Sequence, residues 1–245
     1  LLVRLQAFEN EEFIFPSVHH SFRFCMLTIG KSAQAEFVFF ARQPHQIHDR
    51  RRCFSLTPDE FQLINPNTLT CPVFRSERDA ELTKKLYRAA PVLIEEGREG
   101  GNPWGINFMT MFHMSNDSHL FADADEEGML PLYEAKMIHQ FDHRWATYTA
   151  DGETRDVAEI EKTDPNFTVV PRYWLSESEV NERLTKRDRD GNVIWCWDRG
   201  WLIGWRDVTS AHVLRTVIAS VVPRVGVGHK MPLLFVSESL SSKRI

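Results

Sequence analysis

The sequence predicts an α+β protein that is rich in β-strands and has short helices. Apolar runs with many β-branched and aromatic residues recur along the chain, and helix-capping signals introduce only short segments. With 245 residues, 42% of them hydrophobic, the chain can form one large domain or a domain with an appended piece. The predicted strands cover residues 22–29, 36–41, 104–113, 201–208, 215–222 and 233–236. The predicted helices cover residues 58–64, 76–90 and 176–184.

The first two apolar runs predict a hairpin. Residues 22–29 and 36–41 flank a short polar link, and their continuous apolar character indicates strands that are largely buried on both faces. Downstream, Thr57, Pro58 and Glu60 combine a capping box with proline at the first helical position, which predicts a helix start.

The longest predicted helix begins after Ser76, a good capping residue, and ends before Pro91. Its apolar residues predict one buried side, formed by Ala80, Leu82, Leu86, Tyr87 and Ala90.

In the second half, the acidic residues 149–167 predict a surface excursion, and residues 171–175 predict a return to the core. Ser176 then caps a short helix, and Asp190-Gly191 predicts a turn. The glycine-containing segment 225–230 lacks the spacing of a phosphate-binding loop and predicts a hairpin turn.

Residues 131–148 interleave polar and aromatic side chains more densely than any other stretch. The spacing of their apolar residues fits neither strict alternation nor a helical repeat, which predicts a short strand that ends in a polar turn. Such a concentration of donors, acceptors and imidazoles is typical of a functional site. The apolar residues are Leu132, Met137, Ile138, Phe141 and Trp145.

Four interpretations of this stretch compete, and two of them need no macromolecular ligand. In the structural one, Asp142 pairs with Arg144 and the histidines lie at a wet edge. In the second, His139 and His143 bind zinc from a helix, but Gln140 stands where that motif has its glutamate.

The third interpretation is a metal-dependent nuclease of the PD-(D/E)xK class. Glu134 and Lys136 have the Glu-x-Lys spacing of that class, with Asp123 or Asp125 as a further carboxylate. The fourth is direct recognition of nucleic acid, in which polar side chains of the turn contact base edges or phosphates.

Charge is distributed unevenly along the chain. The net charge of −5 argues against a non-specific nucleic-acid binder. Residues 1–171 contain 17 basic and 26 acidic residues, whereas residues 172–245 contain 12 and 8. A separate basic cluster occupies residues 50–52. The downstream excess of basic residues fits either a solvated basic surface or one that faces phosphates.

No apolar run is long enough to span a membrane, and the first residues do not form a signal peptide, so we expect a cytoplasmic protein without membrane contacts. The four cysteines are scattered without Cys-x-x-Cys spacing, which predicts neither a disulfide framework nor a cysteine zinc site. Cys25 and Cys196 have the apolar neighbours of buried thiols. Because no methionine or turn precedes the first apolar residues, we expect a fragment of a longer protein.

Seven segments of the chain carry a family resemblance. They are residues 7–10 (AFEN), 14–16 (IFP), 21–25 (SFRFC), 71–75 (CPVFR), 102–105 (NPWG), 132–144 (LYEAKMIHQFDHR) and 215–219 (RTVIA). In this order they resemble the downstream portion of large bacterial N6-adenine DNA methyltransferases. That family includes the single-chain type IIG restriction–modification enzymes and related methylases of phage-defence systems.

The resemblance implies a division of the chain. Residues 1–42 would be the terminal strands of a Rossmann-like methyltransferase sheet, residues 43–100 a helical connector, and residues 101–245 a β-rich DNA target recognition domain without its closing segment. The family's catalytic motif is not in the sequence, because Asn65-Pro66-Asn67 lacks the second proline and the aromatic residue. Its AdoMet-binding motif is not there either, because no predicted strand is followed by the cofactor glycines. We therefore expect no catalytic, metal or cofactor-binding residue here. AdoMet would be bound by the missing methyltransferase domain of the parent enzyme, which would be a partner alongside double-stranded DNA.

A methyltransferase that flips an adenine out of the duplex needs a separate domain to grip the flanking DNA. For contacts to phosphates we expect Arg172, Arg187, Arg206, Arg224 and Lys230. For contacts to bases we expect Lys136, His139, Gln140, Asp142 and Arg144. The alternatives are the nuclease described above and a protein-interaction module that docks a methyltransferase to a partner nuclease or helicase.

Overall fold

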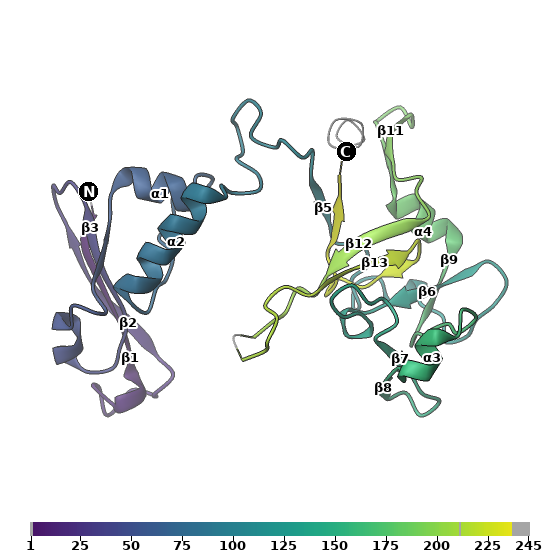
Figure 1. The fold of residues 1–245 in the computed structure, drawn as a ribbon, viewed down its shortest axis with the longest axis horizontal. Coiled ribbons are helices and arrows are strands. Elements are labelled where there is room, and N and C mark those ends of the chain that lie inside the picture. Colours follow the sequence, from purple (N-terminus) through teal and green to yellow (C-terminus); the bar gives the residue numbers. More distant parts are fainter. Residues whose placement is uncertain (1, 211, 237–245) are drawn as a thin grey trace. The chain divides into compact units, whose positions relative to one another are not determined.

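A computed structural model describes residues 2–210 and 212–236, which form two compact units, Leu1–Pro103 (unit 1) and Trp104–Ile245 (unit 2). The predicted fold class is confirmed, because several small sheets with short helices make up both units (Figure 1). No helix in this described part is long and apolar enough to cross a membrane. The helices are α1 (Pro58–Ile64), α2 (Glu77–Ala89), α3 (Glu159–Thr163) and α4 (Glu177–Arg183).

Unit 1 contains one four-stranded sheet with the order β2-β1-β3-β4. Its strands are β1 (Leu2–Glu9), β2 (Arg23–Ile29), β3 (Ala35–Ala41) and β4 (Phe54–Leu56). The predicted hairpin is wrong, because β1 lies between β2 and β3, antiparallel to the first and parallel to the second. Both predicted strands exist, but only β3 is largely buried. The edge strand β2 leaves Met26 and Ile29 exposed, and Cys25 is exposed as well.

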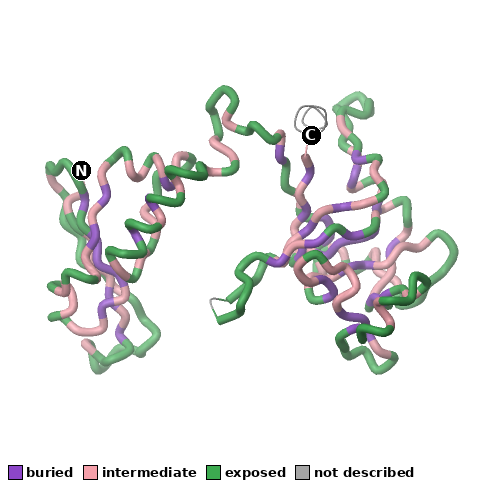
Figure 2. The backbone as a smooth tube through the Cα atoms, in the orientation of Figure 1, coloured by how far each residue is buried: buried purple, intermediate pink, exposed green. Residues whose placement is uncertain are grey.

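Helices α1 and α2 pack against this sheet, and the predicted caps are confirmed. The Glu60 N–H donates to Thr57 Oγ1 (3.3 Å), and the Thr57 N–H donates to Glu60 Oε2 (3.0 Å). The Asp79 N–H donates to Ser76 Oγ (3.2 Å). The resulting core joins strands and helices, and Figure 2 shows buried residues along β3 and the inner turns of the helices. It is formed mainly by Phe37, Phe39, Phe54, Leu56, Ile64 and Ala80.

The predicted apolar side of α2 is only partly confirmed, because Tyr87 packs against the core but the two leucines do not. Ala80 is buried, but Leu82 and Leu86 are 54% and 58% exposed, whereas Lys84 is 4% exposed. Residues four apart share a helix face, so burial of Ala80 carries Lys84 inward with it. The Lys84 ammonium lies 3.0 Å from Glu60 of α1 and also pairs with Glu81. Burial lowers the pKa of Lys84, but the hydrogen bonds to these carboxylates outweigh it and raise the pKa overall.

In unit 1 the sheet continues past residue 42, because β4 pairs with β3. Their assignment to a methyltransferase sheet and a connector stays a prediction.

Within its described residues, unit 2 contains two larger sheets and two short pairs of strands. The sheets have the orders β13-β12-β15-β5 and β14-β6-β9, and the pairs are β10-β11 and β7-β8. A hydrophobic core joins the two larger sheets and includes Phe112, Leu132, Met137, Leu175, Leu202 and Val227. The strands are β5 (Asn107–Met109), β6 (Met129–Tyr133), β7 (Ala146–Tyr148), β8 (Thr154–Asp156), β9 (Trp174–Ser176), β10 (Thr185–Arg187), β11 (Val193–Cys196), β12 (Trp201–Trp205), β13 (Ala219–Pro223), β14 (Gly226–Val227) and β15 (Leu233–Phe235).

Several local predictions for unit 2 are confirmed. The Glu179 N–H donates to Ser176 Oγ (3.3 Å) at the start of α4, and Gly191 (φ +87°) turns the chain between β10 and β11. Leu175 is fully buried, as expected for a return to the core. Cys196 is exposed on β11, contrary to expectation.

Two predictions for unit 2 are wrong. Residues 225–230 do not form a hairpin turn, because β14 pairs in parallel with β6 inside the core. A Cβ at Gly226 would lie 2.4 Å from Leu175 Cδ1, so the glycine permits this close approach. The strand predicted over residues 215–222 begins only at Ala219. Residues 207–210 and 212–217 instead form an exposed arm between β12 and β13, the 207–217 arm (Figures 1 and 2). Residue 211 lies outside the described residues.

Lys84→Ala tests the buried ion pairs of unit 1. We expect the free energy of unfolding of this unit to fall by about 2 kcal/mol, because Glu60 would lose its nearest cation at a half-buried position. Urea denaturation followed by circular dichroism measures this change. The adjacent Lys85→Ala is the control, because Lys85 is exposed, and equal effects of the two substitutions would contradict the arrangement.

Candidate nucleic-acid interface

The polar turn predicted after β6 is present. A short 3-10 helix, η4 (Ala135–Met137), follows the strand, and residues 139–142 then form a tight turn. The His139 N–H donates to the Asp142 carbonyl (2.7 Å), and the Asp142 N–H donates to the His139 carbonyl (3.0 Å). We refer to these four residues as the 139–142 turn.

Hydrogen bonds over long sequence distances fix the 139–142 turn to β13, and fix Ile138, just before the turn, to Arg206, which follows β12. Arg206 donates from Nε (3.1 Å) and Nη2 (2.6 Å) to the carbonyl oxygen of Ile138. The Ala219 N–H donates to Gln140 Oε1 (2.9 Å), and the Phe141 N–H donates to the Ala219 carbonyl (2.9 Å). Burial lowers the pKa of Arg206, which indicates a partly desolvated guanidinium.

A second set of contacts fixes the other end of the turn. Asp142 accepts the Arg144 N–H at Oδ1 (2.8 Å) and pairs with Lys162 at Oδ2 (2.6 Å). The Arg144 guanidinium donates to the carbonyls of Lys162 (2.7 Å), Asp164 (3.1 Å) and Phe167 (3.4 Å). Burial raises the pKa of Asp142, but the Lys162 hydrogen bond and the Arg144 N–H outweigh it, so the carboxylate stays ionised well below neutral pH. The Arg144 side chain therefore fastens the chain near α3 and does not pair with Asp142.

These contacts leave one large apolar side chain outside. Phe141 has φ +62°, and 86% of its surface is exposed. A left-handed backbone costs a residue with a Cβ about 1 kcal/mol, and an exposed phenyl ring gains nothing in return within the unit. Beside the ring, His143 and Trp201 line an open hollow of about 440 Å³. Burial, followed by the charge of Arg144, lowers the pKa of His143, so this imidazole is neutral at pH 7.

Two of the residues predicted to contact phosphates or bases lie beside each other. Lys136 and Lys230 line one hollow of about 240 Å³ together with Glu134. Lys136 Nζ lies 3.9 Å from Glu134 Oε2 and 4.6 Å from the centre of the Tyr148 ring, and Lys230 lies 3.8 Å from Asp207. The Tyr148 hydroxyl donates to Glu134 (2.5 Å), and burial together with this carboxylate raises the pKa of Tyr148.

The remaining predicted contacts are dispersed. Arg172 is exposed, with its guanidinium carbon 5.2 Å from the centre of the Tyr173 ring. Arg187 is exposed on the β10-β11 ribbon and donates to the Gly191 carbonyl (3.1 Å).

Two further predicted contacts have internal partners. Arg224 donates to the Trp197 carbonyl and to Asn181 Oδ1 (2.7 Å), so its guanidinium joins three parts of unit 2. The His139 ring lies 4.3 Å from the Trp145 ring, centre to centre. The role of each predicted residue in DNA contact stays a prediction.

The two metal hypotheses find no matching cluster among the described residues, because no three histidine, cysteine or acidic side chains gather in a way that could hold a metal ion. His139 and His143 lie in a turn and an irregular segment, and Glu134 is bonded by Tyr148. The residues that sequence reasoning missed are Phe141 as an exposed ring and Ala219 as an anchor of the turn. The sequence around Phe141 does not indicate that its ring is exposed, and the sequence around Ala219 does not indicate its hydrogen bonds to residues far away in the chain.

Comparison with models of known protein families finds no match, and comparison with curated proteins finds no similar sequence. The resemblance to N6-adenine DNA methyltransferases therefore stays a prediction.

Arg206→Gln tests how the turn is held. We expect the free energy of unfolding of unit 2 to fall by about 2 kcal/mol, because the Ile138 carbonyl loses two charge-assisted hydrogen bonds. Thermal or urea denaturation measures the effect. Arg172→Gln removes the same charge from an exposed position and should change stability by less than about 0.5 kcal/mol. Equal losses in the two variants would show that Arg206 does not brace the turn.

Proposed function

We propose that unit 2 recognises a specific sequence in double-stranded DNA on behalf of an N6-adenine DNA methyltransferase of the type IIG or phage-defence kind. The single observation that carries the proposal is the 139–142 turn, which is bonded on both sides and presents Phe141 to solvent. The in-order resemblance along nearly the whole chain supports the choice of DNA as the ligand.

The exposed ring suits a duplex whose stacking is opened. Apolar side chains inserted between base steps fill the space left by unstacked bases, and an aromatic ring stacked on a base contributes about 1–3 kcal/mol. Flipping an adenine out of the helix creates such a space. A rigid turn lowers the entropy lost when Phe141 enters it, because the backbone is ordered before DNA binds.

We assign the other predicted residues by what their side chains already do. Gln140, Asp142, Arg144 and Arg206 position the turn, and Arg224 holds β11 near α4. Direct contacts with DNA are assigned to exposed or half-buried side chains that do not position the turn or join parts of the unit. They are Lys136, His139, Arg172, Arg187 and Lys230, with Phe141 added.

The β10-β11 ribbon supplies a second element for the duplex. A two-stranded ribbon fits the major groove, and Lys186, Arg187 and Arg189 lie on it or at its tip. Asp188 also lies at the tip, where it accepts the N–H groups of Asp190 and Asn192, so its charge partly offsets those of the cations.

The resemblance places the reaction in another domain of the parent enzyme. AdoMet would be bound there, and no residue of this chain is proposed to hold it or to catalyse methyl transfer. The parent would act on DNA in the cytoplasm.

A protein-interaction module is the second candidate function, and the 207–217 arm favours it. Leu214 and Val217 of this arm are 97% and 66% exposed, which is typical of side chains that a partner covers.

Selection from a pool of random duplex DNA tests the proposed function. The complete chain is incubated with the pool at a low and a high salt concentration, and the bound fraction is sequenced. We expect one short motif to be enriched and its affinity to fall steeply as salt rises. Absence of binding at both salt concentrations would reject DNA recognition and favour the interaction module.

Phe141→Gly separates the function of the ring from the stability of the turn. Glycine adopts a positive φ without strain, so we expect the variant to be as stable as the parent protein or slightly more stable. Its affinity for the enriched duplex should nevertheless fall about tenfold, because the stacking ring is lost. Fluorescence anisotropy measures the affinity.

Phe22→Ala, which removes another exposed phenyl ring, is the control and should leave DNA affinity unchanged. Unchanged affinity of the Phe141→Gly variant would remove Phe141 from the interface.

A further inference from the structure

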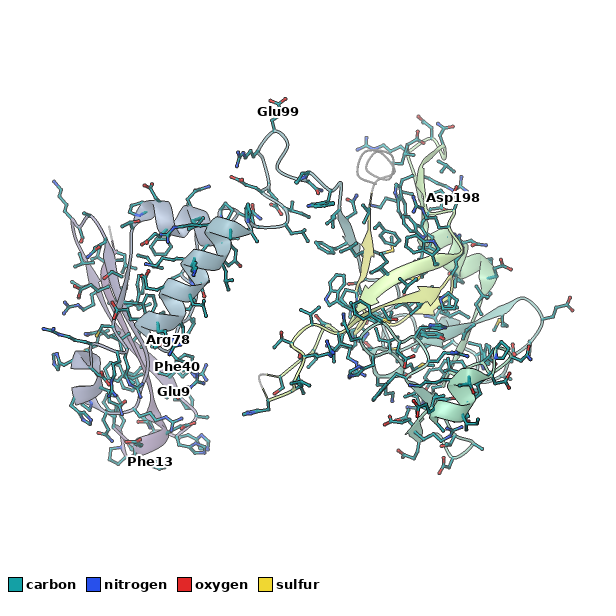
Figure 3. All side chains as sticks on the ribbon, viewed as in Figure 1. Glu9, Phe13, Phe40, Arg78, Glu99 and Asp198 are labelled. Atoms are coloured by element: carbon teal, nitrogen blue, oxygen red, sulfur yellow. The ribbon has the colours of Figure 1, made fainter. Side chains whose placement is uncertain are left out.

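Four arginines surround a hollow of about 570 Å³ in unit 1. Two of them, Arg51 and Arg52, come from the basic cluster at residues 50–52, which the proposed function leaves unused. Figure 3 labels Phe40 and Glu9, which lie close to each other at this hollow. The arginines are Arg42, Arg51, Arg52 and Arg75.

Phe40 holds two of these arginines. The register between β1 and β3 shifts after the pair Gln6 and Val38, and Phe40 lies in this irregular part with φ +58°. Its carbonyl accepts a hydrogen bond from Arg52 Nη1 (3.3 Å). Its ring lies under the guanidinium of Arg75, with 4.5 Å from the guanidinium carbon to the ring centre. A strained backbone held by its surroundings in this way often marks a functional position.

Only two of the four arginines at the hollow pair with carboxylates among the described residues. Arg42 pairs with Glu9 (3.5 Å) and with Glu11, and Arg51 donates to both carboxylate oxygens of Asp49 (3.0 and 2.9 Å). Glu12 also lines the hollow and accepts a hydrogen bond from Gln43 Nε2 (3.0 Å).

Arg52 and Arg75 differ from the other two arginines, because within residues 2–210 and 212–236 neither has a carboxylate at ion-pair distance. Each guanidinium has five N–H donors, and the contacts with Phe40 use few of them.

We propose that Arg52 and Arg75 bind a phosphate group in this hollow. A guanidinium offers two parallel N–H groups that match two phosphate oxygens, and two guanidinia held by one residue can share one phosphate. Phe40 positions both of them, through its carbonyl and through its ring. The hollow is open to solvent and large enough for a phosphate that remains attached to a larger molecule.

The phosphate can come from two sources. One is the DNA backbone, and this version rests on the proposed function of the chain. The other is a free phosphate compound, such as inorganic phosphate or a nucleotide. The chemistry of recognition is the same, so the test has one part for each source.

In the first part, the complete chain is titrated with inorganic phosphate by isothermal titration calorimetry. We expect Arg75→Gln and Arg52→Gln each to raise the Kd about tenfold or more. Arg50→Gln and Arg78→Gln remove neighbouring exposed charges that do not line the hollow, and they should leave the Kd within about twofold of the parent value.

Arg52→Gln also removes the hydrogen bond to Phe40, so its folding is checked by urea denaturation. Arg75→Lys provides a second variant that keeps the charge and loses the paired N–H groups. It should bind inorganic phosphate more weakly than the parent chain.

In the second part, the affinity for the enriched duplex is measured against salt concentration. If the phosphate belongs to DNA, the double variant Arg52→Gln, Arg75→Gln should reduce the slope of log K against log salt by about 1. An unchanged slope together with weakened binding of inorganic phosphate assigns the site to a free phosphate compound. Equal phosphate binding and equal slopes in parent and variants would overturn the proposal. Because inorganic phosphate is titrated without DNA, failure of the DNA selection leaves this test intact.

Discussion

The carbonyl oxygen of Ile138 is the point on which the proposed interface depends. A backbone carbonyl that is withdrawn from water needs a donor, and Arg206, 68 residues away in the sequence, supplies two N–H groups. This contact, together with the bonds between the turn and Ala219, fixes residues 139–142 against β13. The polar groups named in the turn are thereby bonded within the unit, while the ring of Phe141 stays outside. What the turn offers to a ligand is therefore the apolar ring of Phe141 on a rigid support, together with the half-buried imidazole of His139.

Arginine has the same structural use in both units. Arg52 donates to the carbonyl of Phe40, as Arg206 donates to that of Ile138, and in each case a phenylalanine with positive φ lies at or near the bonded carbonyl. Arg144 and Arg224 likewise bind main-chain carbonyls. Many cations of this acidic chain thus serve its own fold. Any contact with DNA must come from cations that remain exposed, and the net charge of −5 fits selective recognition better than general affinity for phosphate.

The sequence predicts those features that depend on neighbouring residues. The caps at Thr57, Ser76 and Ser176 and the turn at Gly191 follow from local hydrogen bonds and from the conformational freedom of glycine. The strand followed by a polar turn at residues 131–148 was predictable for the same reason.

Features that depend on distant partners were not predictable. The position of β1 inside the sheet, the burial of Lys84 against Glu60, and the parallel pairing of β14 with β6 are set by residues far away in the chain. The exposure of Phe141 belongs to this group, because a phenylalanine in an apolar pattern is normally expected in the core.

The most direct measurement of the central claim is amide hydrogen exchange at Phe141 and Ala219 in the free chain and in the chain bound to its enriched duplex. A turn that is rigid before binding predicts slow exchange at both amides without DNA and little further protection with it. Fast exchange in the free chain, with protection only after DNA is added, would contradict the account.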